Sequence, residues 1–89
     1  MSRCISVLGS TGSIGRQTLD VARTLGVRVA ALTANSGVDA LAAQCREFCP
    51  ELAVLYDGAA AQELKARLAD MNITVLSGMD GLLAAAALP

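Results

Sequence analysis

The feature that most constrains the fold is a glycine-rich segment placed directly after a short apolar run. The run spans residues 4–8 (Cys-Ile-Ser-Val-Leu), and the segment spans residues 9–15 (Gly-Ser-Thr-Gly-Ser-Ile-Gly). The run predicts a strand that stops at the first glycine. A helical pattern follows, whose expected buried face is Ile14, Thr18, Val21, Ala22 and Leu25, with Gly26 ending the helix. A strand, a glycine turn and a helix in this order predict a helix amino terminus that faces an anion.

Each glycine of the turn has its own expected role. Gly9 lets the chain turn sharply off the strand, because glycine adopts backbone angles that other residues avoid. Gly12 has no Cβ, so a pyrophosphate can approach the backbone closely, and Gly15 lets the helix pack tightly against the sheet. No Gly-Lys-Ser/Thr follows, so the turn is not a P-loop. The expected ligand is therefore a dinucleotide pyrophosphate, and the alternative is a glycine turn without a ligand.

Polar groups around the glycines supply further donors. The free N–H groups of the first helical turn, from Thr11 to Ile14, are expected to face the anion. Ser10, Thr11 and Ser13 add hydroxyl groups, although Ser13 fits a helix N-cap equally well. The predicted phosphate site is therefore the whole turn: Gly9, Ser10, Thr11, Gly12, Ser13, Ile14 and Gly15.

Strand and helix patterns alternate through the rest of the chain. Apolar runs predict three further strands, at residues 27–32, 52–55 and 73–76. Helical patterns between them have the expected apolar faces Val38, Leu41, Ala42 and Cys45, then Ala61, Leu64, Leu68 and Met71. A last Leu- and Ala-rich helix opens with a capping box at Ser77-x-x-Asp80 and runs to Leu88. The order β-α-β-α-β-α-β-α predicts an α/β fold, the N-terminal half of a Rossmann-like, doubly wound parallel sheet.

Composition limits the classes of protein that fit. The 89 residues are enough for one small domain, and 54% hydrophobic with 17% charged residues is typical of a globular chain. A net charge of −1 and only one Tyr and one Phe give no basic or stacking surface for nucleic acid. No apolar run approaches the roughly 20 residues that span a bilayer, and no signal peptide opens the chain. A cytoplasmic protein that binds neither membrane nor nucleic acid is expected.

The three cysteines, Cys4, Cys45 and Cys49, form neither a disulfide framework nor a metal-binding pattern. The chain has no histidine and no Cys-x-x-Cys motif. Because zinc sites need more ligands than this, we expect no metal site and interpret the cysteines as small buried apolar residues.

The end of the second strand bears on the choice between NAD and NADP. NAD-binding folds place Asp or Glu about 20 residues after the glycines, to hold the ribose 2′-hydroxyl. Here residues 32–37 are Leu-Thr-Ala-Asn-Ser-Gly, without a carboxylate. Asn35, Ser36 and the N–H groups behind Gly37 can donate hydrogen bonds to a 2′-phosphate, which favours NADP. No Lys or Arg lies in this turn, however, and Ser36 and Asp39 could instead cap one another as a capping box.

The sequence resembles the 1-deoxy-D-xylulose 5-phosphate reductoisomerases. The most specific part is the turn at residues 9–15 followed by Gln-Thr-Leu-Asp-Val at 17–21. The resemblance continues through residues 29–34, 44–50 and 75–78, so it covers nearly the whole chain.

The resemblance implies an NADPH-dependent oxidoreductase of the non-mevalonate route to isoprenoids, which rearranges and reduces its phosphosugar substrate to 2-C-methyl-D-erythritol 4-phosphate with Mg²⁺ or Mn²⁺. It implies that the cofactor phosphates lie at Thr11, Gly12, Ser13 and Ile14, and the 2′-phosphate at Asn35, Ser36 and Gly37. Many family members carry Gly, then Lys or Arg, then Asn at the last three positions, so this chain lacks the usual cation there.

The resemblance also implies that residues 1–89 are the N-terminal part of an NADP-binding domain. The catalytic and C-terminal domains, the metal ligands and the residues that bind the substrate phosphate are then expected outside this chain. Asp57, Asp70 and Asp80 are accordingly expected to be structural. By itself the chain is expected to be inactive, and the full-length protein is expected to be a homodimer.

Two other classes of protein stay open at this stage. One is another NADP-dependent dehydrogenase family, whose chemistry needs a Cys nucleophile or a Tyr-x-x-x-Lys pair. Tyr56 is followed four residues later by Ala60, so this pair is absent here. The other is a nucleotide-binding module without catalysis, although half a Rossmann fold leaves a sheet edge and an apolar face uncovered.

Overall fold

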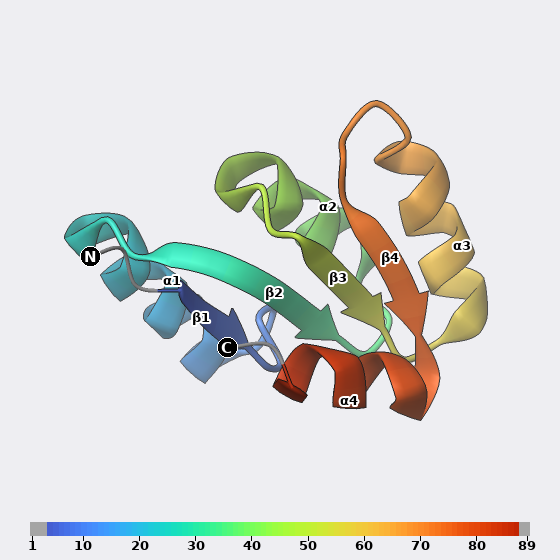
Figure 1. Ribbon diagram of the computed structural model, residues 1–89, viewed down its shortest axis with the longest axis horizontal. Coiled ribbons are helices and arrows are strands. Elements are labelled where there is room, and N and C mark those ends of the chain that lie inside the picture. The colour runs from blue at the N-terminus through green and yellow to red at the C-terminus, as the bar shows by residue number, and fades with distance from the viewer. Residues whose placement is uncertain (1–3, 88–89) are drawn as a thin grey trace.

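A computed structural model describes residues 4–87, in which strands and helices alternate throughout (Figure 1). The strands are β1 (Cys4–Val7), β2 (Arg28–Ala34), β3 (Leu52–Leu55) and β4 (Thr74–Ser77). The helices are α1 (Ser13–Leu25), α2 (Val38–Phe48), α3 (Gly58–Arg67) and α4 (Gly78–Ala87). The predicted β-α-β-α-β-α-β-α order is confirmed. Leu88, the expected end of the last helix, lies outside the described residues.

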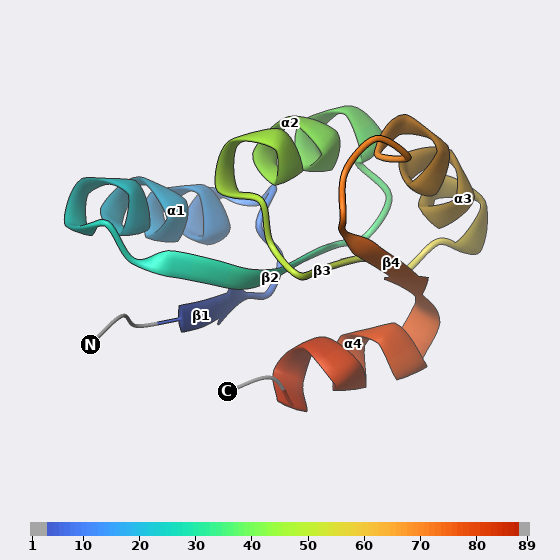
Figure 2. The same cartoon turned by 45° about the horizontal axis from the view of Figure 1, so that its top comes forward.

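The four strands form one parallel sheet in the order β1-β2-β3-β4. The carboxyl ends of neighbouring strands lie side by side, since Val7 pairs with Leu32 and Ala34 pairs with Leu55. Helices α1, α2 and α3 cover one face of the sheet and α4 covers the other, as Figure 2 shows. Helices on both faces are the mark of a doubly wound sheet, so the predicted fold class is confirmed.

The larger core lies between the sheet and the three helices on one face. Its fully buried side chains include Leu32 of β2, Leu41 of α2 and Leu64 of α3. A smaller core lies under α4, around Val54 and Ala85. Strands β2 and β3 are therefore covered on both faces, which explains why apolar residues run through them without alternation.

The expected buried face of α1 is largely wrong. Four of its five residues are exposed: Ile14 (80%), Val21 (56%), Leu25 (69%) and Thr18. Ala22 is buried as expected, together with Gly15 and Leu19. The reason is the close approach of α1 to the preceding turn, which only a residue without a Cβ allows at Gly15. The helix therefore turns Gly15, Leu19 and Ala22 inward, and Ile14, Val21 and Leu25 outward.

Helix α2 buries the face predicted for it. Of the face predicted for α3, Ala61 and Leu64 are buried within the helix, whereas Leu68 and Met71 lie beyond its end at Arg67, where Leu68 is buried and Met71 is partly buried. Gly26 ends α1 in the left-handed conformation (φ 70°), as predicted. The capping box at Ser36 and Asp39 is wrong, because α2 has Gly37 as its N-cap, with no side-chain hydrogen bond there. Ser77 and Asp80 likewise form no hydrogen bond with each other in the described part of the chain.

Cys45 is fully buried, as expected for a small apolar side chain, whereas Cys4 and Cys49 are exposed, so the expectation is wrong for these two. Burial raises the pKa of the Cys45 thiol to about 12, and the nearby Cys49 adds to this rise. Between residues 4 and 87, no cluster of three or more Cys, Asp or Glu side chains could hold a metal ion. None of the described helices is long and apolar enough to cross a membrane.

Candidate functional site

The glycine-rich turn joins the carboxyl end of β1 to the amino end of α1. Gly9 adopts a left-handed backbone (φ 69°), which confirms its predicted role in the sharp turn. The N–H of Gly12 donates to the carbonyl of Gly9 (3.1 Å), and the N–H of Arg16 donates to the carbonyl of Gly12 (2.9 Å). Within residues 4–87, the backbone N–H groups of Thr11, Ser13 and Ile14 have no recorded acceptor. These donors are available to an anion, as the sequence predicts.

Ser13 is the first residue of α1, and Gly12 is its N-cap. The alternative role of Ser13 as the N-cap is therefore wrong. Its hydroxyl makes no capping hydrogen bond, and Ser13 is exposed at the helix end together with Ile14. Both residues lie where a ligand of the turn would meet the first helical turn.

Gly15 and Gly12 are glycines for different reasons. A Cβ on Gly15 would lie 2.2 Å from the carbonyl oxygen of Gly9 and 2.7 Å from the Cα of Ser10, so this fold excludes any other residue. A Cβ on Gly12 would meet only the oxygen of Gly9, at an ordinary 3.5 Å. The backbone of Gly12 (φ −82°, ψ 174°) is also open to every residue type. Nothing in the described structure requires glycine at position 12, so the lack of a Cβ there suits an outside ligand that approaches the backbone.

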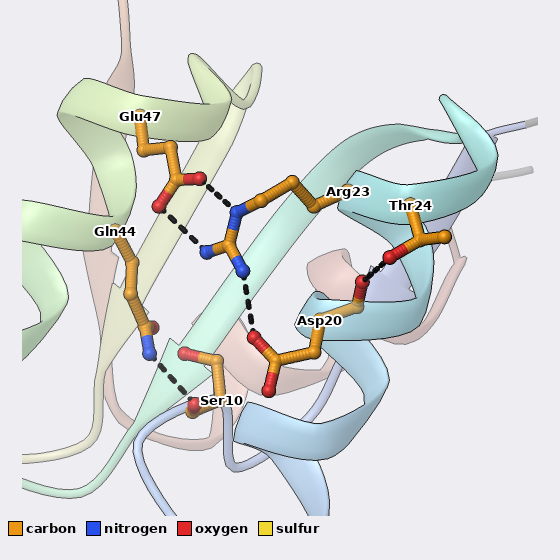
Figure 3. A network of polar contacts seen from close by, with 6 residues as sticks. All are labelled: Ser10, Asp20, Arg23, Thr24, Gln44 and Glu47. Atoms are coloured by element: carbon orange, nitrogen blue, oxygen red, sulfur yellow. Dashed lines mark hydrogen bonds and ion pairs between the residues drawn. The ribbon is translucent and has the colours of Figure 1, made fainter.

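Ser10 does not face outward with the other residues of the turn. It is fully buried, and its Oγ has no hydrogen-bond partner among the described residues. Thr33, at the end of β2, accepts a hydrogen bond from the N–H of Gly9 through Oγ1 (3.0 Å) and another from the N–H of Ser10 through its carbonyl (2.8 Å). Gln44 of α2 donates from Nε2 to the carbonyl of Ser10 (2.8 Å), as Figure 3 shows.

Thr33 and Gln44 were not predicted as part of the site from the sequence. A signal was present for Thr33, because it is a polar residue inside an apolar strand and is 2% exposed. Buried hydroxyls of this kind are usually hydrogen-bonded, so Thr33 was a candidate support for a neighbouring loop. Gln44 carried no such signal, since a glutamine within a helix is most often at the surface.

The second predicted segment, Asn35, Ser36 and Gly37, follows β2 and is exposed. The backbone of this segment is held by the N–H of Asp57, which donates to the carbonyl of Asn35 (3.0 Å). Asp57 also caps α3, with its side chain accepting from the N–H of Ala59 (3.0 Å), so its expected structural role is confirmed. The side chains of Asn35 and Ser36 are therefore free to meet a ligand on a backbone that is held in place.

The acidic residue closest in sequence to this segment is paired. Asp39, in the first turn of α2, forms an ion pair with Arg67 of α3. This pairing takes the place of the capping box and offsets a negative charge beside the segment. Asp70 likewise pairs with Arg46 (3.1 Å), which lowers the pKa of Asp70 and confirms a structural role for it.

An open hollow of about 250 Å³ lies at the carboxyl ends of the strands, between the two predicted segments. Its lining comes from the turn, from the ends of β2 and β3 and from α4: Gly9, Thr33, Ala34, Asn35, Tyr56 and Leu82. Open parallel sheets bind ligands at this edge. A second hollow of similar volume, bounded by α3, β4 and α4, contains none of the predicted site residues.

Ionic contacts join the carboxyl-terminal parts of α1 and α2 (Figure 3). Arg23 of α1 binds the carboxylate of Glu47 through two nitrogens, one of them at 2.8 Å, and also binds Asp20 (2.6 Å). Its guanidinium lies 5.4 Å from the centre of the Phe48 ring. The hydrogen bonds to Arg23 lower the pKa of Glu47 and raise the pKa of Arg23. The helix that follows residues 35–37 is thus tied to the helix that follows the turn.

The family model for 1-deoxy-D-xylulose 5-phosphate reductoisomerase matches residues 5–89. Proteins of that name are similar in sequence, including one from Lachnoclostridium phytofermentans (53% identity over 94% of this chain) and one from Moorella thermoacetica (52% over 99%). The chain covers only 22% and 23% of their lengths. The Zymomonas mobilis reductoisomerase in complex with NADPH has a similar structure, with a TM-score of 0.92 at 39% identity over 99% of this chain and 24% of that one. The chain belongs to the 1-deoxy-D-xylulose 5-phosphate reductoisomerase family.

Proposed function

We propose that this chain holds NADPH for a reductoisomerase of this family. The observation that carries the proposal is Gly12, whose missing Cβ the fold itself does not require. The pyrophosphate would lie against Gly12 and accept hydrogen bonds from Thr11, Ser13 and Ile14. Gly9 and Gly15 shape the turn, and the buried Ser10 supports it from below. Solved structures of related reductoisomerases contain NADPH, which supports the same assignment.

The adenosine 2′-phosphate would lie at Asn35, Ser36 and Gly37. The exposed side chains of Asn35 and Ser36 and the free helix end behind Gly37 supply donors, and Asp39 is paired with Arg67, which also binds Glu63. The usual cation is missing from residues 35–37, so this site would hold the 2′-phosphate by neutral hydrogen bonds. We therefore propose a preference for NADPH over NADH that is weaker than a Lys or Arg at Ser36 would give.

The full-length protein would convert 1-deoxy-D-xylulose 5-phosphate to 2-C-methyl-D-erythritol 4-phosphate. NADPH supplies the hydride, and a bound Mg²⁺ or Mn²⁺ polarises the substrate oxygens. A related reductoisomerase has been solved with NADPH, fosmidomycin and magnesium. The described residues of this chain form no metal cluster, so the metal and substrate sites would be built by other parts of the polypeptide. We propose that the full-length protein is a cytoplasmic homodimer, and that residues 1–89 are inactive alone.

An absorbance assay of NADPH consumption tests this function. The full-length protein should consume NADPH only when the substrate and Mg²⁺ or Mn²⁺ are both present, and a chelator should stop the reaction. Residues 1–89 alone should consume none. If the full-length protein fails to turn over this substrate but reduces another carbonyl compound, a different NADP-dependent dehydrogenase is the correct assignment. Tight nucleotide binding without any turnover would favour a binding module.

A further inference from the structure

Three hydrogen bonds hold the base of the glycine-rich turn from beneath. Two of them end on Thr33, which accepts from the N–H groups of Gly9 (3.0 Å) and Ser10 (2.8 Å). The third comes from the side chain of Gln44, whose Nε2 donates to the carbonyl of Ser10 (2.8 Å). Thr33 belongs to the strand beside β1, whereas Gln44 comes from α2, more than 30 positions along the chain from the turn. Gln44 is therefore the one contact among these three that ties the turn to a helix.

The carboxamide of Gln44 is not explained by its contribution to the stability of the fold. Its Oε1 is buried and accepts no hydrogen bond from any residue between 4 and 87. A buried polar atom without a partner is unfavourable, so a Met of similar length would suit this partly buried position better. The donated hydrogen bond to Ser10 is what the glutamine adds.

That hydrogen bond sets the direction of a donor on the other side of the same peptide group. The carbonyl of Ser10 and the N–H of Thr11 belong to one trans peptide, in which the two groups point in opposite directions. Gln44 draws the carbonyl of Ser10 inward, so the N–H of Thr11 points away from Gln44. This N–H has no recorded acceptor among the described residues, and it is one of the donors that the proposed pyrophosphate site needs.

We infer that Gln44 is a positioning residue for the cofactor, which acts by fixing the Ser10–Thr11 peptide so that the N–H of Thr11 faces the pyrophosphate. This inference rests on the proposed function. Gln44 itself touches no cofactor atom in this account. Its effect is confined to ligands that carry a pyrophosphate, because the 2′-phosphate segment at residues 35–37 does not depend on the Ser10 carbonyl.

The test compares Gln44→Met with the wild type in the full-length protein, since Met keeps the length of the side chain and removes the donor. Gln62→Met is the matched control, because Gln62 is an exposed glutamine on α3 outside the proposed site. Dissociation constants are measured for NADPH and for adenosine 2′-monophosphate, which has the 2′-phosphate and no phosphate at the position of the pyrophosphate. We expect Gln44→Met to weaken NADPH binding about tenfold (about 1.4 kcal/mol) and to leave binding of the monophosphate within about twofold. In turnover, the KM for NADPH should rise by more than kcat falls.

A second variant, Gln44→Glu, keeps the shape of the side chain and turns the donor into a carboxylate that faces the Ser10 carbonyl. It should weaken NADPH binding at least as much as Gln44→Met, whereas Gln62→Met should change neither ligand. Equal weakening of both ligands by Gln44→Met would show general damage to the site and overturn the inference, as would unchanged NADPH binding. If the wild type binds no NADPH, the proposed function itself fails, and that result is distinct from an unaffected variant.

Discussion

Separate substitutions of Gly12 and Gly15 should impair two different properties of the protein. Gly15→Ala places a Cβ 2.2 Å from the oxygen of Gly9 and 2.7 Å from the Cα of Ser10. Both are backbone atoms, so α1 or the turn has to move. Overpacking of this kind is destabilising by about 1–3 kcal/mol, occasionally more. We therefore expect a clear loss of stability in Gly15→Ala, accompanied by weaker NADPH binding because the turn is displaced.

Gly12→Ser should leave the fold intact. The nearest atom to its Cβ is 3.5 Å away, the backbone angles suit serine, and serine is a favourable N-cap for α1. The unfolding free energy should change by less than about 0.5 kcal/mol. The new Cβ should push the pyrophosphate off at least one charge-assisted hydrogen bond, which is about 1.5–3 kcal/mol. NADPH binding should therefore weaken by roughly 10- to 150-fold.

Thermal unfolding and fluorescence titration with NADPH, both on the full-length protein, measure the two properties. The expected pattern is a lower unfolding midpoint for Gly15→Ala alone and a large rise in the NADPH dissociation constant for Gly12→Ser. If Gly12→Ser lowers the unfolding midpoint as much as Gly15→Ala, then the fold requires this glycine and the central observation is wrong. Wild-type NADPH affinity in Gly12→Ser would refute the contact between Gly12 and the pyrophosphate.

Three further results are expected. Ser36→Arg adds a cation beside the proposed 2′-phosphate and should tighten NADPH binding about tenfold. This gain in affinity should shrink at high salt, and NADH binding should not gain. An unchanged ratio of NADPH to NADH affinity would argue against the placement of the 2′-phosphate. Glu47→Gln removes a partner of Arg23. Because the folded state lowers the pKa of Glu47, this pair stabilises the fold above the pKa of the unfolded chain, about 4.5, and the benefit is lost as the pH falls through the folded pKa. Chemical unfolding should show a difference from wild type at pH 7 that shrinks as the pH is lowered below about 4.5. In the 89-residue chain, iodoacetamide at pH 8 should label Cys4 and Cys49 well before Cys45, because the Cys45 thiol is buried and has a pKa of about 12. Rapid labelling of all three cysteines would contradict the burial of Cys45 in the core.

The strands and two of the helices were predictable because their signals are local. The strand at Leu52–Leu55 has the predicted bounds, since a Glu and a Tyr flank four apolar residues. The apolar face of α2 and that of α3 as far as Leu64 were also predicted correctly, because apolar side chains recur there at the helical period. The glycine turn was placed correctly by its position between a strand and a helix.

The orientation of α1 could not be predicted from apolar periodicity. Its outward face carries Ile14, Val21 and Leu25, whereas its inward face carries Gly15, Leu19 and Ala22. Periodicity favours large apolar residues, but the close contact at Gly15 depends on the path of the turn, which the sequence pattern does not report. The support of the turn by Gln44 was missed for the same reason, because it joins residues 34 positions apart through the packing of α2 on the sheet.

A calorimetric titration of the full-length protein with NADPH and, separately, with NADH tests the central claim most directly. The claim is that the turn holds the pyrophosphate and that Asn35, Ser36 and Gly37 hold the 2′-phosphate. It predicts saturable binding of one NADPH per chain, with NADH bound several-fold more weakly because it lacks the 2′-phosphate. Preference for NADH would contradict the 2′-phosphate site while leaving the turn in place. Failure to bind either nucleotide would contradict the dinucleotide site as a whole.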